Sequence, residues 1–225
     1  MLVSIVIPFY NNWTLTHQRM MELHDFIQTP CEIILVNDAS TEEGIDGGVA
    51  WWQKFSGIKH KVRYIKLEEN HGFGWSMNIG TSKATGDIII LLSNDVIVMS
   101  DFVTEIVTLL QENNKYFIGG EVLIGDTGWN KINNTIIPYA NGWLLACTRD
   151  AWEDIGGFDL NFQRFDYEDV DISATAVSKG YILKALTNSK LKHIGGATVY
   201  KYYPDRQKYT LENRQRFIEK WKDRL

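Results

Sequence analysis

One stretch constrains the fold of this chain more than any other: five consecutive Ile and Leu residues at 88–92, which end on polar residues. The run has no polar face, which is typical of a strand buried on both sides in a largely parallel sheet. A buried helix is the alternative, but the short length of the run, Gly86 before it and its β-branched content favour a strand. Ligands collect at the carboxyl ends of strands in open α/β sheets, so we expect Ser93, Asn94 and Asp95 to bind a ligand. A solvated turn after a core strand is the alternative for these three residues.

The composition is that of an ordinary globular protein, with 44% hydrophobic and 23% charged residues in a chain of 225. The apolar stretch from Leu2 to Tyr10 is too short to cross a bilayer and has no basic residue before it. We therefore expect neither a signal peptide nor a membrane anchor. Cys31 and Cys147 lie far apart in apolar segments, which favours reduced core thiols over a disulfide. These features predict a cytoplasmic protein, with peripheral association at the inner membrane face as an alternative.

The net charge of −5 hides a strong asymmetry along the chain. Residues 179–225 hold 12 Lys and Arg against 4 Asp and Glu, a net charge of +8, so residues 1–178 carry −13. A basic tail of this kind is a candidate for contact with an anionic partner or with an acceptor. A helix that packs on the acidic body, held partly by the charge contrast, is an equally weighted alternative.

Apolar runs alternate with helical patterns through the first half of the chain. Asn12 is expected to cap the first helix, and Ser100 to cap a helix after the central run. This alternation predicts the α/β class, with a single Rossmann-like domain in which helices flank a mostly parallel central sheet. Besides the central run, strands are predicted at 3–7, where Pro8 ends the strand, at 32–36 and at 62–67.

The second half of the chain is predicted to hold two more strands, a core segment, a polar loop and a terminal helix. The loop contains Trp129, either a stacking platform for a sugar or a loop anchor. The anchor is favoured, because aromatic residues bury a large area wherever they lie. The predicted elements are the strands at 117–124 and 181–186, the core segment at 141–147, the loop at 125–138 and the helix at 211–221.

A glycine-rich segment from Asn70 to Gly80 follows the third predicted strand. Gly72 and Gly74 resemble part of a dinucleotide-binding fingerprint, but Met77 stands where the third glycine is expected and the segment follows the wrong strand. A glycine-rich turn that leads into a helix can still cradle a diphosphate through its backbone N–H groups.

The most acidic short segment, 166–171, holds four carboxylates in six residues. Asp166 is predicted as the N-cap of the following helix, and Glu168, Asp169 and Asp171 would lie in its first turn, where the helix dipole favours negative charge. Capping explains one or two of the four carboxylates. We therefore expect the cluster to serve chemistry as well.

Six groups of short motifs follow one another between Ser4 and about Thr198. They are Ser4-Ile5-Val6-Ile7-Pro8-Phe9-Tyr10-Asn11, Val36-Asn37-Asp38-Ala39-Ser40, Asn70-His71-Gly72-Phe73-Gly74 with Asn78-Ile79-Gly80, Leu92-Ser93-Asn94-Asp95, Gly157-Phe158-Asp159 with Glu168-Asp169-Val170-Asp171, and His193-Ile194-Gly195-Gly196-Ala197. In this order the motifs resemble those of the family 2 glycosyltransferases with the GT-A fold, and within them the bacterial rhamnosyltransferase-like group. Two positions depart from the pattern. Ser93 replaces the first aspartate of the metal-binding motif, and Thr175 stands where many members carry an arginine.

The resemblance implies an inverting glycosyltransferase. It would move a sugar from a UDP- or dTDP-linked donor to a hydroxyl of a glycan or lipid-linked saccharide. Mn²⁺ or Mg²⁺ would be bound by Asp95 and His193. Asp169 would be the catalytic base, and Glu168 would help to orient the acceptor or donor. The residues implied for donor binding are Pro8, Tyr10, Asp38, Asn70, Gly72, Asn78, Ser93 and Asn94.

The same resemblance implies a division of labour along one domain. Residues 1–98 would bind the nucleotide sugar, residues 99–200 would bind the acceptor and supply catalysis, and residues 201–225 would form the basic tail. Two other function classes stay open. One is a non-catalytic nucleotide-sugar or glycan-binding module on the same fold. The other is a transferase that acts on modified bases of phage DNA, for which the basic tail is the sole support.

Overall fold

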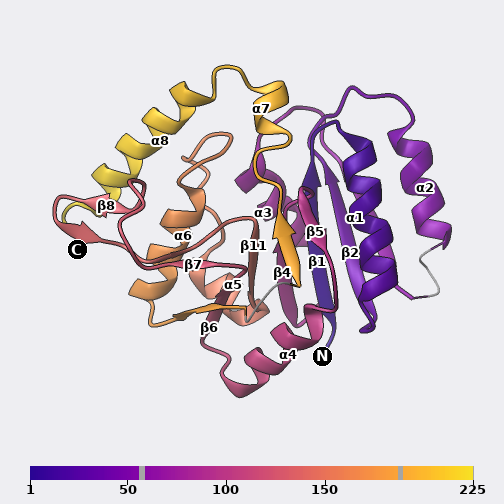
Figure 1. Cartoon of the computed structure of the whole chain (residues 1–225), viewed down its shortest axis with the longest axis horizontal. Coiled ribbons are helices and arrows are strands. Elements are labelled where there is room, and N and C mark those ends of the chain that lie inside the picture. The colour runs from indigo at the N-terminus through magenta and orange to yellow at the C-terminus, as the bar shows by residue number, and fades with distance from the viewer. Residues whose placement is uncertain (56–58, 187–189, 225) are drawn as a thin grey trace.

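A seven-stranded, mostly parallel sheet forms the centre of the molecule (Figure 1). The computed structural model describes residues 1–55, 59–186 and 190–224. From one edge to the other the strands are β12 (Ile182–Ala185), β6 (Tyr116–Gly119), β11 (Leu144–Thr148), β4 (Ile88–Leu92), β1 (Val3–Phe9), β2 (Cys31–Asn37) and β3 (Lys61–Lys66). In this sheet only β11 runs antiparallel to its neighbours, β4 and β6. The predicted fold class is confirmed.

Eight helices and three short ribbons complete the described parts of the chain. The helices are α1 (Trp13–Phe26), α2 (Ile45–Phe55), α3 (Phe73–Lys83), α4 (Val103–Glu112), α5 (Arg149–Ile155), α6 (Glu168–Ser178), α7 (Val199–Tyr202) and α8 (Arg206–Trp221). The ribbons pair β5 (Val96–Val98) with β13 (Leu191–His193), β7 (Val122–Leu123) with β10 (Tyr139–Ala140), and β8 (Lys131–Ile132) with β9 (Thr135–Ile136). Within the described ranges, no helix is both long and apolar enough to cross a membrane.

Helices cover both faces of the sheet because its central strands are apolar on both sides. Every residue of β1, β2 and β4 is buried. On one face, α1, α2 and α4 supply a core that includes Met20 and Val49. On the other face, α3, α5 and α6 supply Met77, Trp152 and Ile172. The polar residues of these strands therefore lie at the strand ends and not along the faces of the sheet.

Several predicted boundaries move in the structure. The first strand runs through Pro8 to Phe9, because β4 pairs with β1 only as far as Val6 and no neighbour on that side needs the missing N–H of Pro8. The strand predicted at 117–124 divides into β6 and β7, and the predicted loop at 125–138 contains the ribbon of β8 and β9. The terminal helix begins earlier than predicted.

Only one of the three predicted N-caps lies at the expected position. Asn12 does stand at the N-cap of α1, but its side chain makes no cap hydrogen bond. Phe102, and not Ser100, is the N-cap of α4. The N-cap of α6 is Tyr167, because the carboxylate of Asp166 turns away to bind α8.

The basic tail forms α8, which lies along the edge of the molecule farthest from α2 (Figure 1). Phe217 and Trp221 of α8 are buried in a third apolar cluster, together with Phe162, Tyr167 and Val170. This packing supports the alternative in which the tail is a helix held on the body.

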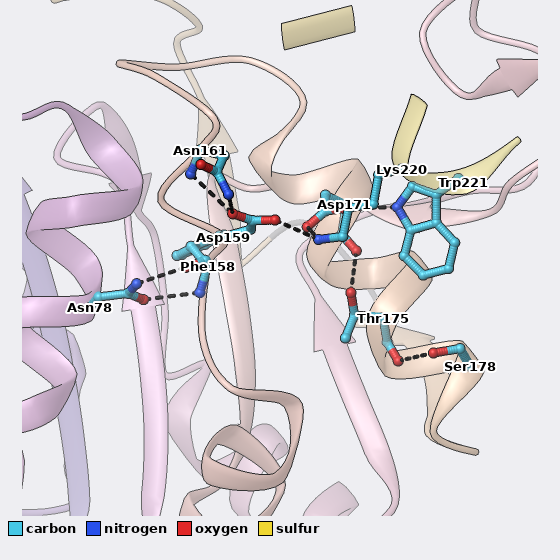
Figure 2. Close-up of polar contacts among 9 residues, drawn as sticks. All are labelled: Asn78, Phe158, Asp159, Asn161, Asp171, Thr175, Ser178, Lys220 and Trp221. Atoms are coloured by element: carbon cyan, nitrogen blue, oxygen red, sulfur yellow. Dashed lines mark hydrogen bonds and ion pairs between the residues drawn. The ribbon is translucent and has the colours of Figure 1, made fainter. Parts of the chain in front are cut away.

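Ionic contacts fix the end of α8 to the segment around α6 (Figure 2). Lys220 Nζ donates to Asp159 Oδ2 at 2.7 Å and to Asp171 Oδ2 at 2.8 Å, and Trp221 Nε1 donates to Asp171 Oδ1 at 2.8 Å. Asp171 is therefore an anchor for α8, since both of its oxygens accept bonds from that helix. Part of the positive charge of the tail is thus neutralised by the body, which weakens the feature that suggested a nucleic-acid acceptor.

We expect Lys220→Met to lower the free energy of unfolding by about 2 kcal/mol, because it leaves the buried carboxylate of Asp171 with a single partner and Asp159 without its cation. Chemical denaturation measures the change. Lys222→Met is the matched control, because Lys222 is exposed on the same stretch and should leave stability nearly unchanged. Equal losses in the two variants would contradict the anchoring role.

Gly72, at the start of α3, packs directly against the backbone before α6. Its φ is 91°, and a Cβ at this position would lie 2.4 Å from Arg164 Cα. Phe73 N donates to Arg164 O at 2.8 Å across this contact. Only glycine combines this backbone conformation with so close an approach.

Gly72→Ala should destabilise the chain by clearly more than Gly128→Ala. Gly128 also has a left-handed φ of 80°, but among the described residues no atom lies within 4 Å of the position that a Cβ would take there. The control should therefore lose only about 1–2 kcal/mol from backbone strain, whereas Gly72→Ala adds a steric overlap with Arg164. Denaturation curves of both variants test the difference, and equal losses would refute the close-packing argument.

Candidate active site

A cavity of about 610 Å³ opens at the carboxyl ends of β1, β2 and β4. The N-terminus of α3, the loop before α6 and the segment after β13 form further parts of its wall. The sequence correctly predicts that polar residues from several strands gather where the carboxyl ends of those strands meet. Ten of the candidate residues line the cavity: Pro8, Tyr10, Asp38, Gly72, Ser93, Asn94, Asp95, Glu168, Asp169 and His193.

Asp95 and His193 meet at one side of this cavity although they are far apart in the sequence. The antiparallel ribbon of β5 and β13 aligns His193 with Val96, the residue after Asp95. His193 Nε2 lies 3.2 Å from Asp95 Oδ1, and Ser93 Oγ donates to the same oxygen at 2.6 Å. Burial opposes ionisation of Asp95, but the hydrogen bonds from His193 and Ser93 outweigh it and lower its pKa. The carboxylate is thus kept charged in a largely buried place.

The Asp95 and His193 pair fits a divalent cation. Asp95 Oδ1 and His193 Nε2 lie 3.2 Å apart in one wall of the cavity, and His193 can serve as a ligand once Nε2 loses the hydrogen that it donates to Asp95. Oxygen and imidazole ligands suit Mn²⁺, and oxygen ligands suit Mg²⁺. Within the described residues, no group of three or more His, Cys, Asp and Glu side chains is arranged to hold a metal. Water and ligand oxygens would have to complete the coordination.

Asp38 and Asn70 form a support for the wall of the cavity. Asp38 accepts hydrogen bonds from the backbone N–H groups of His71 and Gly72, both at 2.8 Å. Burial raises the pKa of Asp38, and these two bonds oppose that rise. Asn70 does not line the cavity: its Nδ2 donates to Asp38 O, and its Oδ1 accepts from Arg164. The side chain of Asn70 therefore braces the loop from behind.

Asn78, like Asn70, is a candidate residue that the structure places outside the lining of the cavity. Its Nδ2 donates to Phe158 O at 2.8 Å and its Oδ1 accepts from Phe158 N at 3.0 Å (Figure 2). Asn78 does not line the cavity. The expectation that it contacts a donor is thus corrected: its amide is used to join α3 to the segment after α5.

Tyr10 and Asn94 lie in the cavity wall with partners of their own. The ring of Tyr10 contacts the rings of Tyr202 and Tyr203, with centroids 5.5 Å and 5.9 Å away. Asn94 Nδ2 donates to Thr16 Oγ1 of α1 at 3.1 Å. Each side chain is therefore held in place before any ligand arrives.

Glu168 and Asp169 begin α6 at another part of the same cavity. Asp169 Oδ2 accepts from Gly142 N at 3.0 Å, and its Oδ1 accepts from Val170 N at 2.8 Å. Glu168 is 9% exposed, and its Oε2 has no hydrogen-bond partner among the described residues. An unpaired buried oxygen in a cavity wall is suited to a polar group of a ligand.

The two carboxyl groups have unusual acidities. Burial raises the pKa of Asp169 to about 6, against the opposing hydrogen bonds from Gly142 and Val170. Burial and the neighbouring Asp169 raise the pKa of Glu168 well above its ordinary value. A carboxylate whose pKa approaches neutrality is suited to accept a proton from a substrate hydroxyl.

Some residues of the wall were not singled out from the sequence. Trp143 stacks on His193, with ring centroids 5.6 Å apart and planes 20° apart. Arg164, Tyr203 and Arg206 also line the cavity. Asn141-Gly142 is a turn signal that could have drawn attention to this stretch. No local pattern marks the other three, because tertiary packing brings them here.

Trp129 lines the cavity and also packs on the protein. Its side chain is 39% exposed, and its ring centroid lies 5.5 Å from that of Tyr167. The contact with Tyr167 agrees with an anchoring role. The exposed part of the indole is also available to stack on a ligand.

The family model described as "Glycosyl transferase family 2" matches residues 4–185. An uncharacterized glycosyltransferase of Rickettsia felis is 29% identical over 163 residues, which are 65% of this chain and 26% of that protein. The chain thus spans about a quarter of the length of this curated relative.

Solved glycosyltransferase structures share the fold. GalNAc-T7, solved with UDP, GalNAc and Mn²⁺, has a TM-score of 0.74 at 19% identity and covers 99% of this chain and 49% of its own. The mannosyltransferase PcManGT of Pyrobaculum calidifontis, solved with GDP-Man and Mn²⁺, has a TM-score of 0.67 at 19% identity and covers 83% of this chain and 55% of its own. The narrower likeness to the rhamnosyltransferase-like group stays a prediction. With the matched family model and the GT-A architecture in place, the chain belongs to glycosyltransferase family 2.

Proposed function

We propose that this chain transfers a sugar from a nucleoside diphosphate donor, UDP- or dTDP-linked, to a hydroxyl of a glycan or lipid-linked saccharide, with inversion at the anomeric carbon. The single observation that supports this most strongly is the convergence of two unlike groups on one cavity. Asp95 with His193 offers cation ligands, and Asp169 offers a carboxylate of raised pKa. Transfer from a diphosphate needs both a partner for the leaving group and a base for the acceptor.

The donor lies, in this proposal, along residues 1–98, at the ends of β1, β2 and β4. The turn at Gly72, which Asp38 braces, begins α3 and lines this part of the cavity. A bound Mn²⁺ or Mg²⁺ ion would neutralise charge that develops on the diphosphate. Asp95 and His193 would hold that ion, and the hydrogen bond from Ser93 would help to fix the Asp95 carboxylate.

The acceptor approaches Asp169 from the part formed by residues 99–200. Two backbone N–H groups fix the Asp169 carboxylate, so that it can take the hydroxyl proton as the oxygen attacks the anomeric carbon. The unpaired Oε2 of Glu168 orients a second polar group of the acceptor or donor. Trp129 offers an apolar surface nearby for a sugar ring. A merely binding module would have no need of a carboxylate tuned toward neutrality, and release of nucleoside diphosphate separates the two functions.

Nucleotide binding should depend on a divalent cation, because the diphosphate would otherwise face the charge of Asp95. Asp95→Ala should abolish most of the Mn²⁺-dependent affinity for UDP or dTDP, and His193→Ala should weaken it. Isothermal calorimetry with Mn²⁺ and with EDTA makes the comparison. Equal affinity in the two conditions for the unaltered chain would show that the metal assignment is wrong.

Asp169→Asn should reduce turnover by about 10²- to 10⁴-fold, because it removes the proton acceptor while leaving the donor region untouched. Release of nucleoside diphosphate from a panel of UDP-, dTDP- and GDP-sugars with Mn²⁺ measures turnover. Glu168→Gln is the matched neighbour, with a smaller expected loss. If Glu168→Gln abolishes turnover while Asp169→Asn keeps it, the two roles must be exchanged.

A further inference from the structure

The turn that presents Glu168 and Asp169 has a conformation that its sequence does not favour. Arg164, Asp166 and Tyr167 have φ values of 64°, 72° and 73°, in the left-handed region that favours glycine. Each such residue costs about 1–2 kcal/mol relative to an ordinary conformation. The turn therefore persists because its surroundings hold it.

Asn213 of α8 makes several of the hydrogen bonds that keep the turn in this conformation. It is fully buried, and its Nδ2, which carries two hydrogens, lies within hydrogen-bond distance of the carbonyl oxygens of Gln163, Phe165 and Asp166 at 2.9, 2.9 and 3.0 Å. Its Oδ1 accepts from Gln163 N at 3.1 Å. One side chain of the tail thus satisfies successive backbone groups of the turn.

Arg206 of α8 makes the ionic contact with the same turn. Its Nε donates to Asp166 Oδ2 at 2.9 Å and its NH2 group donates to Asp166 Oδ1 at 2.5 Å. Thr210 Oγ1 also donates to Asp166 Oδ2, at 2.5 Å. Asp166 is 12% exposed and Arg206 is 29% exposed, so this bidentate pair is partly shielded from solvent.

The charges of Asp166 and Arg206 affect the pKa values of the carboxyl groups at the start of α6. The negative charge of Asp166 raises the pKa of both Glu168 and Asp169, and Arg206 acts in the opposite direction on Glu168. The other ionisable groups near Asp169 belong to several elements. Tyr139 comes from β10, and the same cavity is lined by Asp38, Asp95, Arg164, Tyr167 and His193. Two positive groups of α8 contact the turn. Arg206 donates two hydrogen bonds to the Asp166 carboxylate, and Arg214 makes a hydrogen bond with the Tyr167 side chain.

We propose that Arg206 is a positioning residue for the catalytic carboxylates: through Asp166 it holds the left-handed turn before α6 and neutralises the carboxylate next to Glu168 and Asp169. This inference rests on the proposed role of Asp169 as the base. In this proposal the basic tail controls the charge near Glu168 and Asp169, where the acceptor would bind. A purely structural contact would affect stability alone.

The test measures the pKa of Asp169 by carboxyl carbon-13 NMR titration, with the resonance assigned from its loss in Asp169→Asn. Arg206→Gln should raise this pKa, because Asp166 then acts without its counter-ion. A rise of one unit would cut the ionised fraction at pH 6 from about half to about one tenth, a fivefold loss. Asp166→Asn should shift the pKa the other way. General loosening of the fold cannot produce opposite shifts in the two variants.

Two further variants separate charge from packing. Lys208→Gln removes one positive charge from an exposed position of the same helix and should leave the titration of Asp169 unchanged. Arg206→Lys keeps the charge and should stay close to the unaltered protein. Should Arg206→Gln fail to fold in a thermal melt, the double variant Arg206→Gln with Asp166→Asn removes the pair without leaving a lone charge. The pKa of Asp169 should then lie above its value in Asp166→Asn alone, where the positive charge of Arg206 remains, and equal values would overturn the proposal. The proposal is overturned if Asp166→Asn leaves the titration unchanged, or if Arg206→Gln behaves like Lys208→Gln.

Turnover connects the titration to catalysis. The acid limb of nucleoside diphosphate release with Mn²⁺ should move to higher pH in Arg206→Gln by the amount seen for Asp169, while the UDP affinity stays within about twofold. If the NMR pKa moves and the acid limb does not, Asp169 is not the base, and the catalytic role of Arg206 falls with it. If the unaltered chain releases nucleoside diphosphate from none of the donors, the proposed function fails, and the titration alone still decides whether Arg206 controls Asp169.

Discussion

The structure depends on the burial of three strands that have no polar face. Because β1, β2 and β4 are apolar on both sides, helices must cover both faces of the sheet, and polar side chains are left only at the strand ends. The carboxyl ends of these parallel strands lie at one edge. The place of the cavity, and the presence of Asp38 and Asp95 in its wall, follow from this single constraint.

The second half of the chain completes the cavity by reaching back to that edge. The ribbon of β5 and β13 brings His193 to Asp95, and the contact of Gly72 with Arg164 joins the start of α3 to the turn before α6. The two sides of the cavity are therefore fixed to each other by backbone pairing and close packing. In the proposed function, this rigidity would hold donor and acceptor in a fixed relative position.

The tail is joined to the body through contacts that differ in kind. Lys220 anchors α8 on the carboxylates of Asp159 and Asp171, and Asn213 holds the backbone of the turn before α6. Buried polar contacts of this sort add little net stability but fix one arrangement, because any other arrangement would leave charges or N–H groups unpaired. Part of the charge asymmetry of the sequence is thus explained by contacts between the basic tail and acidic residues of the body.

The sequence by itself determined the α/β class, the parallel strands of the central sheet and the gathering of Asp38 and Asp95 at their carboxyl ends, because burial and the direction of parallel strands follow from local apolar patterns. It indicated β11 only as a core segment. Only the tertiary structure decided that Asn78 braces Phe158, that Asp166 binds Arg206 instead of capping α6, and that Asp171 anchors the tail. Each of these outcomes depends on a partner distant in sequence. A carboxylate or amide bonds to whichever donor the fold brings near it, and local pattern holds no information about that partner.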